Sequence, residues 1–327
     1  MGRRPLPVAL AAVLVLVLLP ALAAPTLAGN PDKVRHNSIV AHWTAARLKS
    51  AVPRDFSFNP ARGFEKKRKP GGGGGPAVVG ASWTKGGAIL RASGKVYFEM
   101  GGGAWICSGS AAKDSRTGFS LVLTAGHCAY DETNGAFATN WLFIPEFDSA
   151  PTFTCASTTW GCWTASALVV HNGFASAGSF NTQATVHDFA FAVVGPGGKS
   201  GSAQLDATVG SLPIAFNNVA TNDFLDAFGY PAAGKYHGND LTYCAGRIFQ
   251  DSYNANLTWG MNCDMTGGSS GGPWLSSFSE MTGSGTLNSL NSYGYSGIRA
   301  MYGPKFNSNT QAVYNAADAA TGNTIVH

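Results

Sequence analysis

Three short segments of the chain each place a chemically capable polar residue beside an apolar run. Residues 121–128 read Leu-Val-Leu-Thr-Ala-Gly-His-Cys, so a buried strand delivers His127 to its end. Asp188 opens the apolar run of residues 189–194, and glycines flank Ser270 within residues 266–274. Those glycines let the backbone bend sharply and bring its amides close to a ligand. A serine hydroxyl needs a base within hydrogen-bond reach to act as a nucleophile, and these segments supply the residue types for that chemistry.

Each residue also has a simpler explanation. A histidine after an apolar strand can be purely structural, and Asp188 can merely cap a turn. The spacing Gly268-x-Ser270-x-Gly272 also fits the nucleophile turn of esterases, but in that fold the acid and the histidine follow the serine. After Ser270 the only Asp is Asp318 and the only His is His327, the last residue, which argues against an esterase.

The composition indicates which elements must position these residues. Hydrophobic residues make up 45% of the 327, charged residues only 12%, and there are 42 glycines. Such a chain suits an all-β protein with many tight turns, and it argues against a coiled coil or a helical bundle. The apolar stretches Asp226 to Tyr230 and Leu241 to Phe249 predict strands, and Thr310 to Ala320 predicts a C-terminal helix.

The charge is divided unevenly along the chain. Before residue 77 there are 12 Lys and Arg against 3 Asp and Glu, whereas from residue 77 onward there are 10 against 15. The larger part is therefore mildly acidic, and we expect no nucleic-acid partner.

The N-terminus has the pattern of an export signal. Arg3 and Arg4 precede an apolar run, and small residues come after it, so residues 1–28 are predicted to be a removable signal peptide. A membrane anchor is the alternative, but the run is short for a span. We expect a secreted, extracellular monomer with no membrane contact after signal removal.

Residues 29–76 differ in composition from the rest of the chain. They contain Lys66-Lys67-Arg68-Lys69 and the run Gly71 to Gly75, a low-complexity stretch typical of a linker or processing site. We interpret residues 29–76 as a propeptide and residues 77–327 as the functional domain. The alternative is a disordered basic arm that stays attached.

Six cysteines in an exported chain favour disulfides over metal ligands. Spacing pairs Cys107 with Cys128, Cys155 with Cys162, and Cys244 with Cys263. No zinc-type spacing occurs, so no metal ligand is assigned, and a structural calcium ion stays an open alternative. Nothing in the sequence implies an organic cofactor.

Together, the T-A-G-H-C, D-F-A and G-S-S-G-G-P segments resemble those of the chymotrypsin/trypsin-like serine endopeptidases, in the same order of His, Asp and Ser. The resemblance implies two antiparallel six-stranded β-barrels with the active site between them, a C-terminal helix, and protein or peptide substrates. It implies that His127 is the base, Asp188 its orienting acid and Ser270 the nucleophile, with the backbone amides of Gly268 and Ser270 as the oxyanion hole. A secreted binding protein on a catalytically silent scaffold of this kind is the alternative.

The sequence departs from trypsin-like members at several positions. Ser269 replaces the aspartate that pairs with a freed N-terminus, so we expect an oxyanion hole that needs no inserted amine. This exchange moves the resemblance toward bacterial-type members, including the glutamyl endopeptidases.

Few residues in the sequence bear on which substrate side chains the protein would select. Asp264, six residues before Ser270, matches the acid that binds Lys or Arg in trypsin-like members, although it can equally be turned away into hydrogen bonds. Ser292-Tyr293-Gly294 matches the segment that pairs with the substrate backbone, with an ordinary turn as the alternative. Asn291 stands where a glutamyl-specific enzyme would carry histidine. The residues thus favour basic or broad specificity over the glutamyl-specific alternative.

Overall fold

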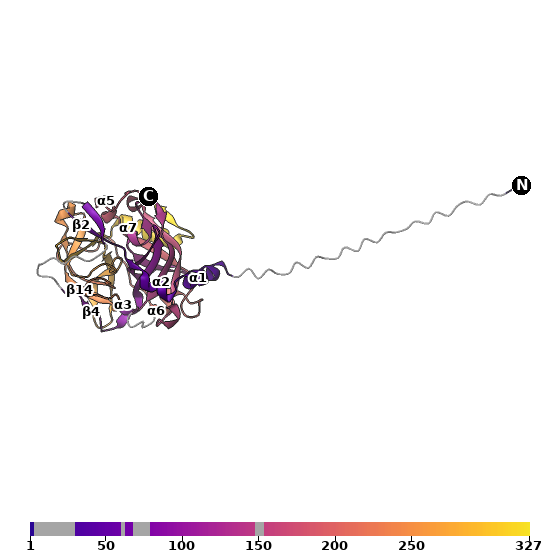
Figure 1. The fold of residues 1–327 in the computed structure, drawn as a ribbon, viewed down its shortest axis with the longest axis horizontal. Coiled ribbons are helices and arrows are strands. Elements are labelled where there is room, and N and C mark those ends of the chain that lie inside the picture. Colours follow the sequence, from indigo (N-terminus) through magenta and orange to yellow (C-terminus); the bar gives the residue numbers. More distant parts are fainter. Residues whose placement is uncertain (3–29, 60–62, 68–78, 148–153) are drawn as a thin grey trace.

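The apolar runs of the first half of the chain form a closed barrel in a computed structural model, which describes residues 1–2, 30–59, 63–67, 79–147 and 154–327 (Figure 1). The barrel strands are β5 (Ser93–Met100), β6 (Gly103–Ala112), β7 (Ser120–Thr124), β10 (Thr139–Pro145), β11 (Trp163–His171) and β12 (Ala190–Val194). They pair in the order β6-β5-β10-β11-β12-β7, and β7 pairs with β6 again, which closes the sheet. Side chains on the inner face of the strands, such as Val122, Phe143 and Ala192, are fully buried.

The second half of the chain divides its strands between two sheets. One holds β18 (Ser284–Leu290), β17 (Pro273–Ser279), β13 (Phe224–Gly229), β14 (Thr242–Arg247) and β4 (Ala81–Ser82), and the other holds β15 (Phe249–Gln250), β16 (Thr258–Asn262) and β20 (Ala300–Pro304). The disulfide Cys244–Cys263 joins β14 of the first sheet to the residue after β16 of the second. A separate apolar cluster that includes Leu225, Met261 and Trp274 fills the space between them.

Several helices pack against this β structure. They are α3 (Gly87–Ala92), α4 (Asn172–Ala175), α5 (Thr182–Val186), α6 (Leu205–Val209) and the C-terminal α7 (Ser308–Ala319), with 3₁₀ turns η1 (Gly126–Cys128), η2 (Cys155–Ser157) and η3 (Ser252–Asn254). Helix α7 begins with a capping box at Asn307, whose side chain accepts from Thr310 N–H, and it packs on β11 and β12. Three further short strands are β8 (Tyr130–Asp131), β9 (Ala136–Phe137) and β21 (Thr324–Val326). No helix among the described residues is long and apolar enough to cross a bilayer.

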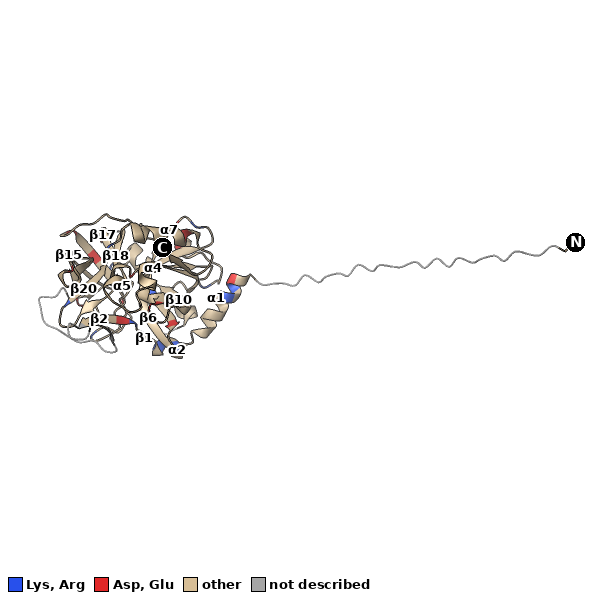
Figure 2. Cartoon of the chain, turned by 90° about the horizontal axis from the view of Figure 1, so that it is seen from above, with Lys and Arg blue, Asp and Glu red and all other residues tan. Residues whose placement is uncertain are grey.

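The N-terminal region is folded onto this body. It forms α1 (Pro31–His42), α2 (Ala45–Ser50), β1 (Val52–Pro53), β2 (Asp55–Asn59) and β3 (Gly63–Lys67). Helix α1 contacts β10 and β11 of the barrel, and Ile39, Trp43 and Leu48 are buried there. Figure 2 shows the Lys and Arg residues of α1 and α2 on a chain that is otherwise sparsely charged.

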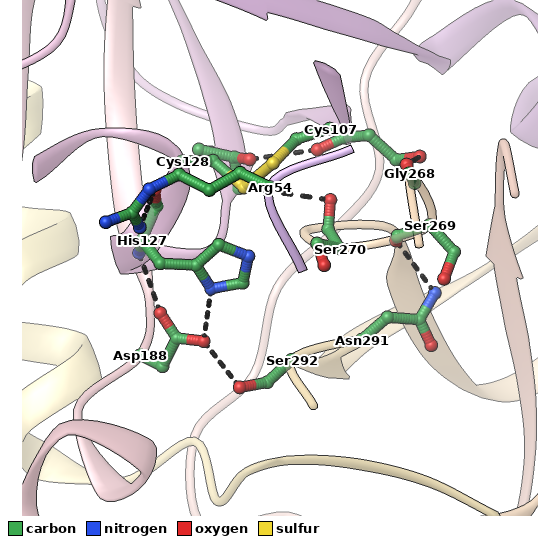
Figure 3. Close-up of a disulfide and its surroundings, with 12 residues drawn as sticks. Arg54, Cys107, His127, Cys128, Asp188, Gly268, Ser269, Ser270, Asn291 and Ser292 are labelled. Atoms are coloured by element: carbon green, nitrogen blue, oxygen red, sulfur yellow. Dashed lines mark hydrogen bonds and ion pairs between the residues drawn. A yellow bond between two sulfur atoms is a disulfide. The ribbon is translucent and has the colours of Figure 1, made fainter. Parts of the chain in front are cut away.

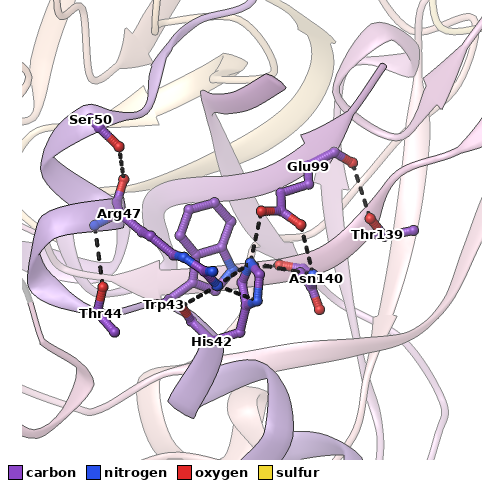
Figure 4. Close-up of polar contacts among 8 residues, drawn as sticks. All are labelled: His42, Trp43, Thr44, Arg47, Ser50, Glu99, Thr139 and Asn140. Carbon is purple, nitrogen blue, oxygen red and sulfur yellow. Dashed lines mark hydrogen bonds and ion pairs between the residues drawn. The ribbon is translucent and has the colours of Figure 1, made fainter. Parts of the chain in front are cut away.

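A polar network fixes the junction between α1 and α2 on the barrel (Figure 4). The ring of His42 lies 2.8 Å from a carboxylate oxygen of Glu99, whose other oxygen accepts from Asn140 at 2.8 Å. The indole N–H of Trp43 donates to the carbonyl oxygen of Asn140 at 2.6 Å. Buried aromatic surface and satisfied hydrogen bonds together hold this region in place.

These observations confirm an all-β fold with a closed six-stranded first barrel and a C-terminal helix. The second half has six long strands, β13, β14, β16, β17, β18 and β20, in two sheets rather than in one continuous ladder. The disordered-arm alternative is wrong for residues 30–59, because Trp43, Leu48 and Phe56 provide enough apolar surface to pack on the body. The predicted signal peptide and the glycine run lie almost wholly outside the described residues.

Candidate active site

His127 lies where the first barrel opens toward the second half. Strand β7 ends at Thr124, and the 3₁₀ turn η1 then carries the histidine. The next residue, Cys128, is bonded to Cys107 of β6, so the turn is tied to the neighbouring strand. His127 is fully buried.

Asp188 orients this histidine through two contacts (Figure 3). Its Oδ1 accepts from the backbone N–H of His127 at 2.8 Å, and its Oδ2 lies 2.8 Å from Nδ1 of the ring. Oδ2 also accepts the hydroxyl of Ser292 at 2.5 Å. Because Nδ1 faces a carboxylate, it carries the proton, and Nε2 is left as the base. Both side chains are fully buried, so water does not compete for these bonds.

Ser270 lies in the loop between β16 and β17, on the opposite side of the cleft from His127 (Figure 3). The loop is hydrogen-bonded to the first barrel through Ser108, whose N–H donates to Ser270 O at 2.7 Å and whose hydroxyl donates to Gly268 O at 2.8 Å. Gly271 has φ +82°, and a Cβ there would lie 2.4 Å from the carbonyl oxygen of Ser108. Only glycine allows this close approach of the two halves.

The backbone amides of Gly268 and Ser270 have no acceptor among the residues that the structure describes. Gly268 takes φ +97°, a conformation that glycine adopts without strain. Two unpaired N–H groups beside a candidate nucleophile are the donors that an oxyanion requires.

Asn291 supports this loop without using a charge, and the sequence did not single it out for this role. Its side-chain N–H groups donate to Ser269 O at 3.1 Å and Phe228 O at 2.7 Å, and its oxygen accepts from the Trp274 indole at 2.7 Å. Ser269 itself donates to Thr266 O at 2.8 Å. Neutral hydrogen bonds therefore hold the position at which trypsin-like members use an aspartate. The only sign of this role in the sequence was the position of Asn291, directly before Ser292.

The segment Ser292-Tyr293-Gly294 borders the site, but its residues have different partners. The hydroxyl of Ser292 donates to Asp188. The hydroxyl of Tyr293 is buried against Asp251, at 2.5 Å, and Thr258. Gly294 begins strand β19 (Gly294–Tyr295), which pairs in parallel with β2 of the N-terminal region. The predicted substrate-pairing edge is thus occupied by the chain itself.

Residues 52–58, which we term the cleft segment, run across the site. At one end Val52 and Pro53 pair with β6, and at the other Ser57 and Phe58 pair with β19. Between these ends, the ring of Phe56 lies edge-on to the imidazole of His127, with centroids 5.3 Å apart.

The cleft segment closes off the candidate base. Phe56 stacks on Phe180 at 4.0 Å, and Phe180 also meets His127 edge-on at 5.7 Å. The Nε2 atom of His127 is buried and has no hydrogen-bond partner among the described residues. In this state the base is not hydrogen-bonded to the Ser270 hydroxyl.

Asp264 is not placed as the sequence analysis expected of a specificity acid. Its Oδ1 accepts from Gly80 N–H at 2.8 Å and from the Tyr236 hydroxyl at 2.5 Å, and its Oδ2 pairs with the Lys235 ammonium at 2.7 Å. Burial alone would raise the pKa of Asp264, but these donors lower it below its ordinary value. The structure therefore shows the second of the two roles considered, an acid turned into hydrogen bonds, because Lys235 already neutralises it.

The cysteines form the pairs Cys107–Cys128, Cys155–Cys162 and Cys244–Cys263, which are the pairs that spacing favoured. One group of potential metal ligands occurs among the described residues, namely Cys107, His127 and Cys128. Both sulfurs are consumed by a disulfide, so the group does not offer a thiolate set.

Comparison with solved structures defines the class. A protease, Anisep, from Arthrobacter nicotinovorans is 38% identical, with a TM-score of 0.60, over 71% of this chain and 97% of that one. A thermostable serine protease, AL20, from an extremophilic microorganism is 36% identical, with a TM-score of 0.61, over 71% and 99% of the two chains. A Glu endopeptidase at 18% identity and a TM-score of 0.55 shares the fold over 76% and 99%. No model of a protein family matches the sequence, and no curated protein does.

The fold, the order of the three site segments and these similarities all indicate the same family. The chain belongs to the chymotrypsin/trypsin-like family of serine proteases. It is a serine endopeptidase, of the bacterial type to which the similar proteases belong.

Proposed function

We propose that the chain is an exported serine endopeptidase that uses His127, Asp188 and Ser270 as its triad and is made as a zymogen. The observation that carries the triad is the buried Asp188, which accepts both from the backbone and from the ring of His127. Peptide bonds are the substrate class, as for the similar proteases.

In the first half-reaction, Ser270 Oγ attacks the peptide carbonyl carbon while His127 Nε2 takes the hydroxyl proton. The negative charge on the carbonyl oxygen is stabilised by the amides of Gly268 and Ser270. The C–N bond then breaks, and His127 gives its proton to the leaving amine. Asp188 stabilises the imidazolium that forms between these two steps.

In the second half-reaction, water replaces the amine. His127 takes a proton from the water as its oxygen attacks the ester carbonyl of the acyl-enzyme. The Ser270 oxygen leaves and regains the proton from His127. The products are two peptides and the original enzyme, so no cofactor is consumed.

The zymogen proposal rests on the cleft segment. Phe56 covers His127, and β2 occupies the strand edge at Gly294 that would pair with a substrate. The similar proteases match 71% of this chain while being covered almost completely, so this chain is the longer one. Cleavage within residues 60–78 and departure of the cleft segment would open the site.

The proposed primary specificity is broad, because Lys235 neutralises the acid that would otherwise select Lys or Arg. A glutamyl preference lacks its histidine, since Asn291 holds the loop instead. Export is inferred from the N-terminal signal pattern and agrees with the three disulfides.

The test uses the full chain with a specific protease site placed in the glycine run Gly71–Gly75. After the cut, an active-site phosphonate should label Ser270, as mapped by mass spectrometry, and casein should be hydrolysed. The variant Ser270→Ala should lose both, while Ser200→Ala, at an exposed serine, should keep them. A cut protein that stays folded, by circular dichroism, yet takes up no label supports the binding-protein alternative.

A further inference from the structure

A buried ion pair lies beside the catalytic histidine, and one partner comes from the cleft segment. Arg54 is 3% exposed, and its Nη2 lies 3.1 Å from Oε2 of Glu132 and 4.0 Å from Oδ1 of Asp131. Its Nη1 donates to the backbone oxygen of His127 at 2.6 Å. The guanidinium is thus held by two carboxylates and by the main chain of the proposed general base.

The acidic partners belong to the body of the protease, and Asp131 is also held by its own loop. Asp131 is in β8, directly after η1, and accepts from the N–H groups of Thr133 and Asn134, each at 3.2 Å, and from the Asn134 amide at 2.9 Å. Burial would raise the pKa of Asp131, but hydrogen bonds from Asn134 and the charge of Arg54 lower it. The carboxylate is therefore oriented as an anion by its own loop.

The site does not provide a hydrogen-bond partner for every nitrogen of the Arg54 guanidinium. The Nε atom of Arg54 is buried without a hydrogen-bond partner, although the side chain is almost fully enclosed and lies over Phe56 at 5.0 Å. Two of the three guanidinium nitrogens are satisfied. A site shaped only to hold Arg54 would satisfy the third as well, because a buried unpaired donor is costly.

Removal of the cleft segment would leave a buried carboxylate without its cationic partner. Glu132 is 3% exposed and has Arg54 as its cationic partner. A buried carboxylate binds a replacement cation strongly, because the fold has already removed water from the carboxylate. An open cavity of about 670 Å³ adjoins the pair, and its lining includes Glu132, Asn134 and Phe180 of the body. Arg54, Phe56 and Phe58 of the cleft segment also line it, so departure of that segment would widen the space for a ligand side chain.

We infer that Glu132 and Asp131 form a cation-binding subsite of the protease, which Arg54 occupies in this structure and which receives a Lys or Arg side chain of the peptide substrate once the cleft segment has left. The subsite lies at the end of the cleft segment away from Gly294. It would therefore select the residue at one fixed distance from the cleaved bond, separate from the position that Asp264 was expected to select. The inference rests on the proposed function, since it assigns a substrate side chain to the same cleft.

The first test measures binding and needs no catalysis. The full chain carrying Ser270→Ala is cut in the glycine run, and a peptide of residues 52–58 competes with its own labelled N-terminal fragment. The peptide with Arg at position 54 should displace the fragment at a concentration about tenfold lower than the peptide with citrulline, which has the same shape and no charge. Equal displacement by the two peptides, or none by either, would overturn the subsite.

The second test measures selection. Cut protein with an intact Ser270 digests a peptide library, and residues on both sides of each cut are counted. The wild type should favour Lys and Arg at one position, and Glu132→Gln should reduce that preference about tenfold through KM while peptides with neutral residues there are cleaved as before. Glu280→Gln, which removes a carboxylate from the exposed pair with Lys85, should keep the preference.

The outcomes separate the two proposals. Failure of phosphonate labelling with preserved arginine-dependent displacement would reject the protease function and retain the cation site. Labelling together with a library profile that Glu132→Gln leaves unchanged would retain the protease and reject the substrate subsite. The variant Glu132→Asp, which keeps the charge, distinguishes loss of charge from loss of folding, because it should retain part of the preference.

Discussion

The aromatic ring of Phe56 stands edge-on against the imidazole of His127, with centroids 5.3 Å apart and an angle of 81° between the planes. Phe56 is separated from His127 by 71 residues and belongs to a different structural unit. Its ring is also stacked on Phe180, so these two rings and the imidazole of His127 form one buried group. Nε2 of His127 is buried beneath these rings and has no hydrogen-bond partner among the described residues, so the proposed activation requires that the cleft segment move away.

Replacing Phe56 with Ala in the uncut full chain should therefore increase the rate at which a phosphonate labels Ser270, by about tenfold or more. Loss of a buried phenylalanine costs about 3–5 kcal/mol, which loosens the segment locally. The rate is measured by intact-mass spectrometry. Val34→Ala, at an exposed position of α1 in the same N-terminal region, serves as the control and should label at the wild-type rate. Equal rates for Phe56→Ala and the control would show that the cleft segment does not limit access.

A second prediction concerns the loop that carries the proposed oxyanion donors, the amides of Gly268 and Ser270. Asn291 makes three hydrogen bonds, two of which hold the carbonyls of Ser269 and Phe228. Asn291→Ala should lower kcat about 10²-fold, because the amides of Gly268 and Ser270 lose their fixed direction. It should also lower the free energy of unfolding by about 1–3 kcal/mol, since buried polar groups lose their partners.

Asn288→Ala is the matched control for that experiment. Asn288 is equally buried in β18 and bonds to Ser276 at 2.5 Å, but it does not contact the loop. It should lower stability by a similar amount with kcat preserved. Parallel losses of kcat in the two variants would mean that the Asn291 effect is only a folding effect.

The third prediction tests the orienting acid. Asp188→Asn should reduce kcat about 10⁴-fold near neutral pH, as the same exchange does in another triad protease, because an amide holds the histidine in the wrong tautomer. Steady-state kinetics on cut protein measure this. Asp206→Asn, which affects a carboxylate bonded to Ser120 far along the chain, should change kcat less than about twofold. A loss below about tenfold for Asp188→Asn would remove Asp188 from the triad.

The three residues of the proposed triad could be picked out from the sequence because each is marked by its immediate neighbours. An apolar strand ends at His127, another begins after Asp188, and glycines surround Ser270, all within stretches of fewer than ten residues. Local patterns of this kind predict the structure well because they define strand ends and turns. The first barrel was predictable for the same reason.

The cleft segment could not be predicted in this way. Its pairing with β19 joins residues more than 200 positions apart, and nothing in Val-Pro-Arg-Asp-Phe-Ser-Phe specifies a partner. Asp264 illustrates the same limit, since a count along the chain located the residue while Lys235, 29 positions away, decided its role. The pair Asp131-Glu132, close after His127 in a chain with few charges, was a signal that the sequence contained and that local pattern did not interpret.

The last prediction concerns stability at low pH. His171 stacks on His187 with ring centroids 4.4 Å apart, and its Nδ1 accepts from Gly173 N–H at 2.9 Å. Burial, together with the smaller effect of the charges of His187 and His327, lowers the pKa of His171 to about 4, from 6.5 in the unfolded chain. Between these values the unfolded chain binds a proton that the folded chain does not, so stability should fall as the pH drops from about 6.5 to about 4.

Urea unfolding of the Ser270→Ala protein at several pH values measures this dependence, with self-digestion excluded. His171→Asn keeps an acceptor for Gly173 N–H and removes the titration, so its stability should depend less steeply on pH across that window. His237→Asn, at an exposed histidine, should leave the dependence unchanged. A slope that is identical in the wild type and in His171→Asn would mean that other groups, such as the carboxylates, cause the loss of stability in acid. A shallower slope in His171→Asn alone would assign the loss of stability in acid to the proton that His171 binds in the unfolded chain and not in the folded one.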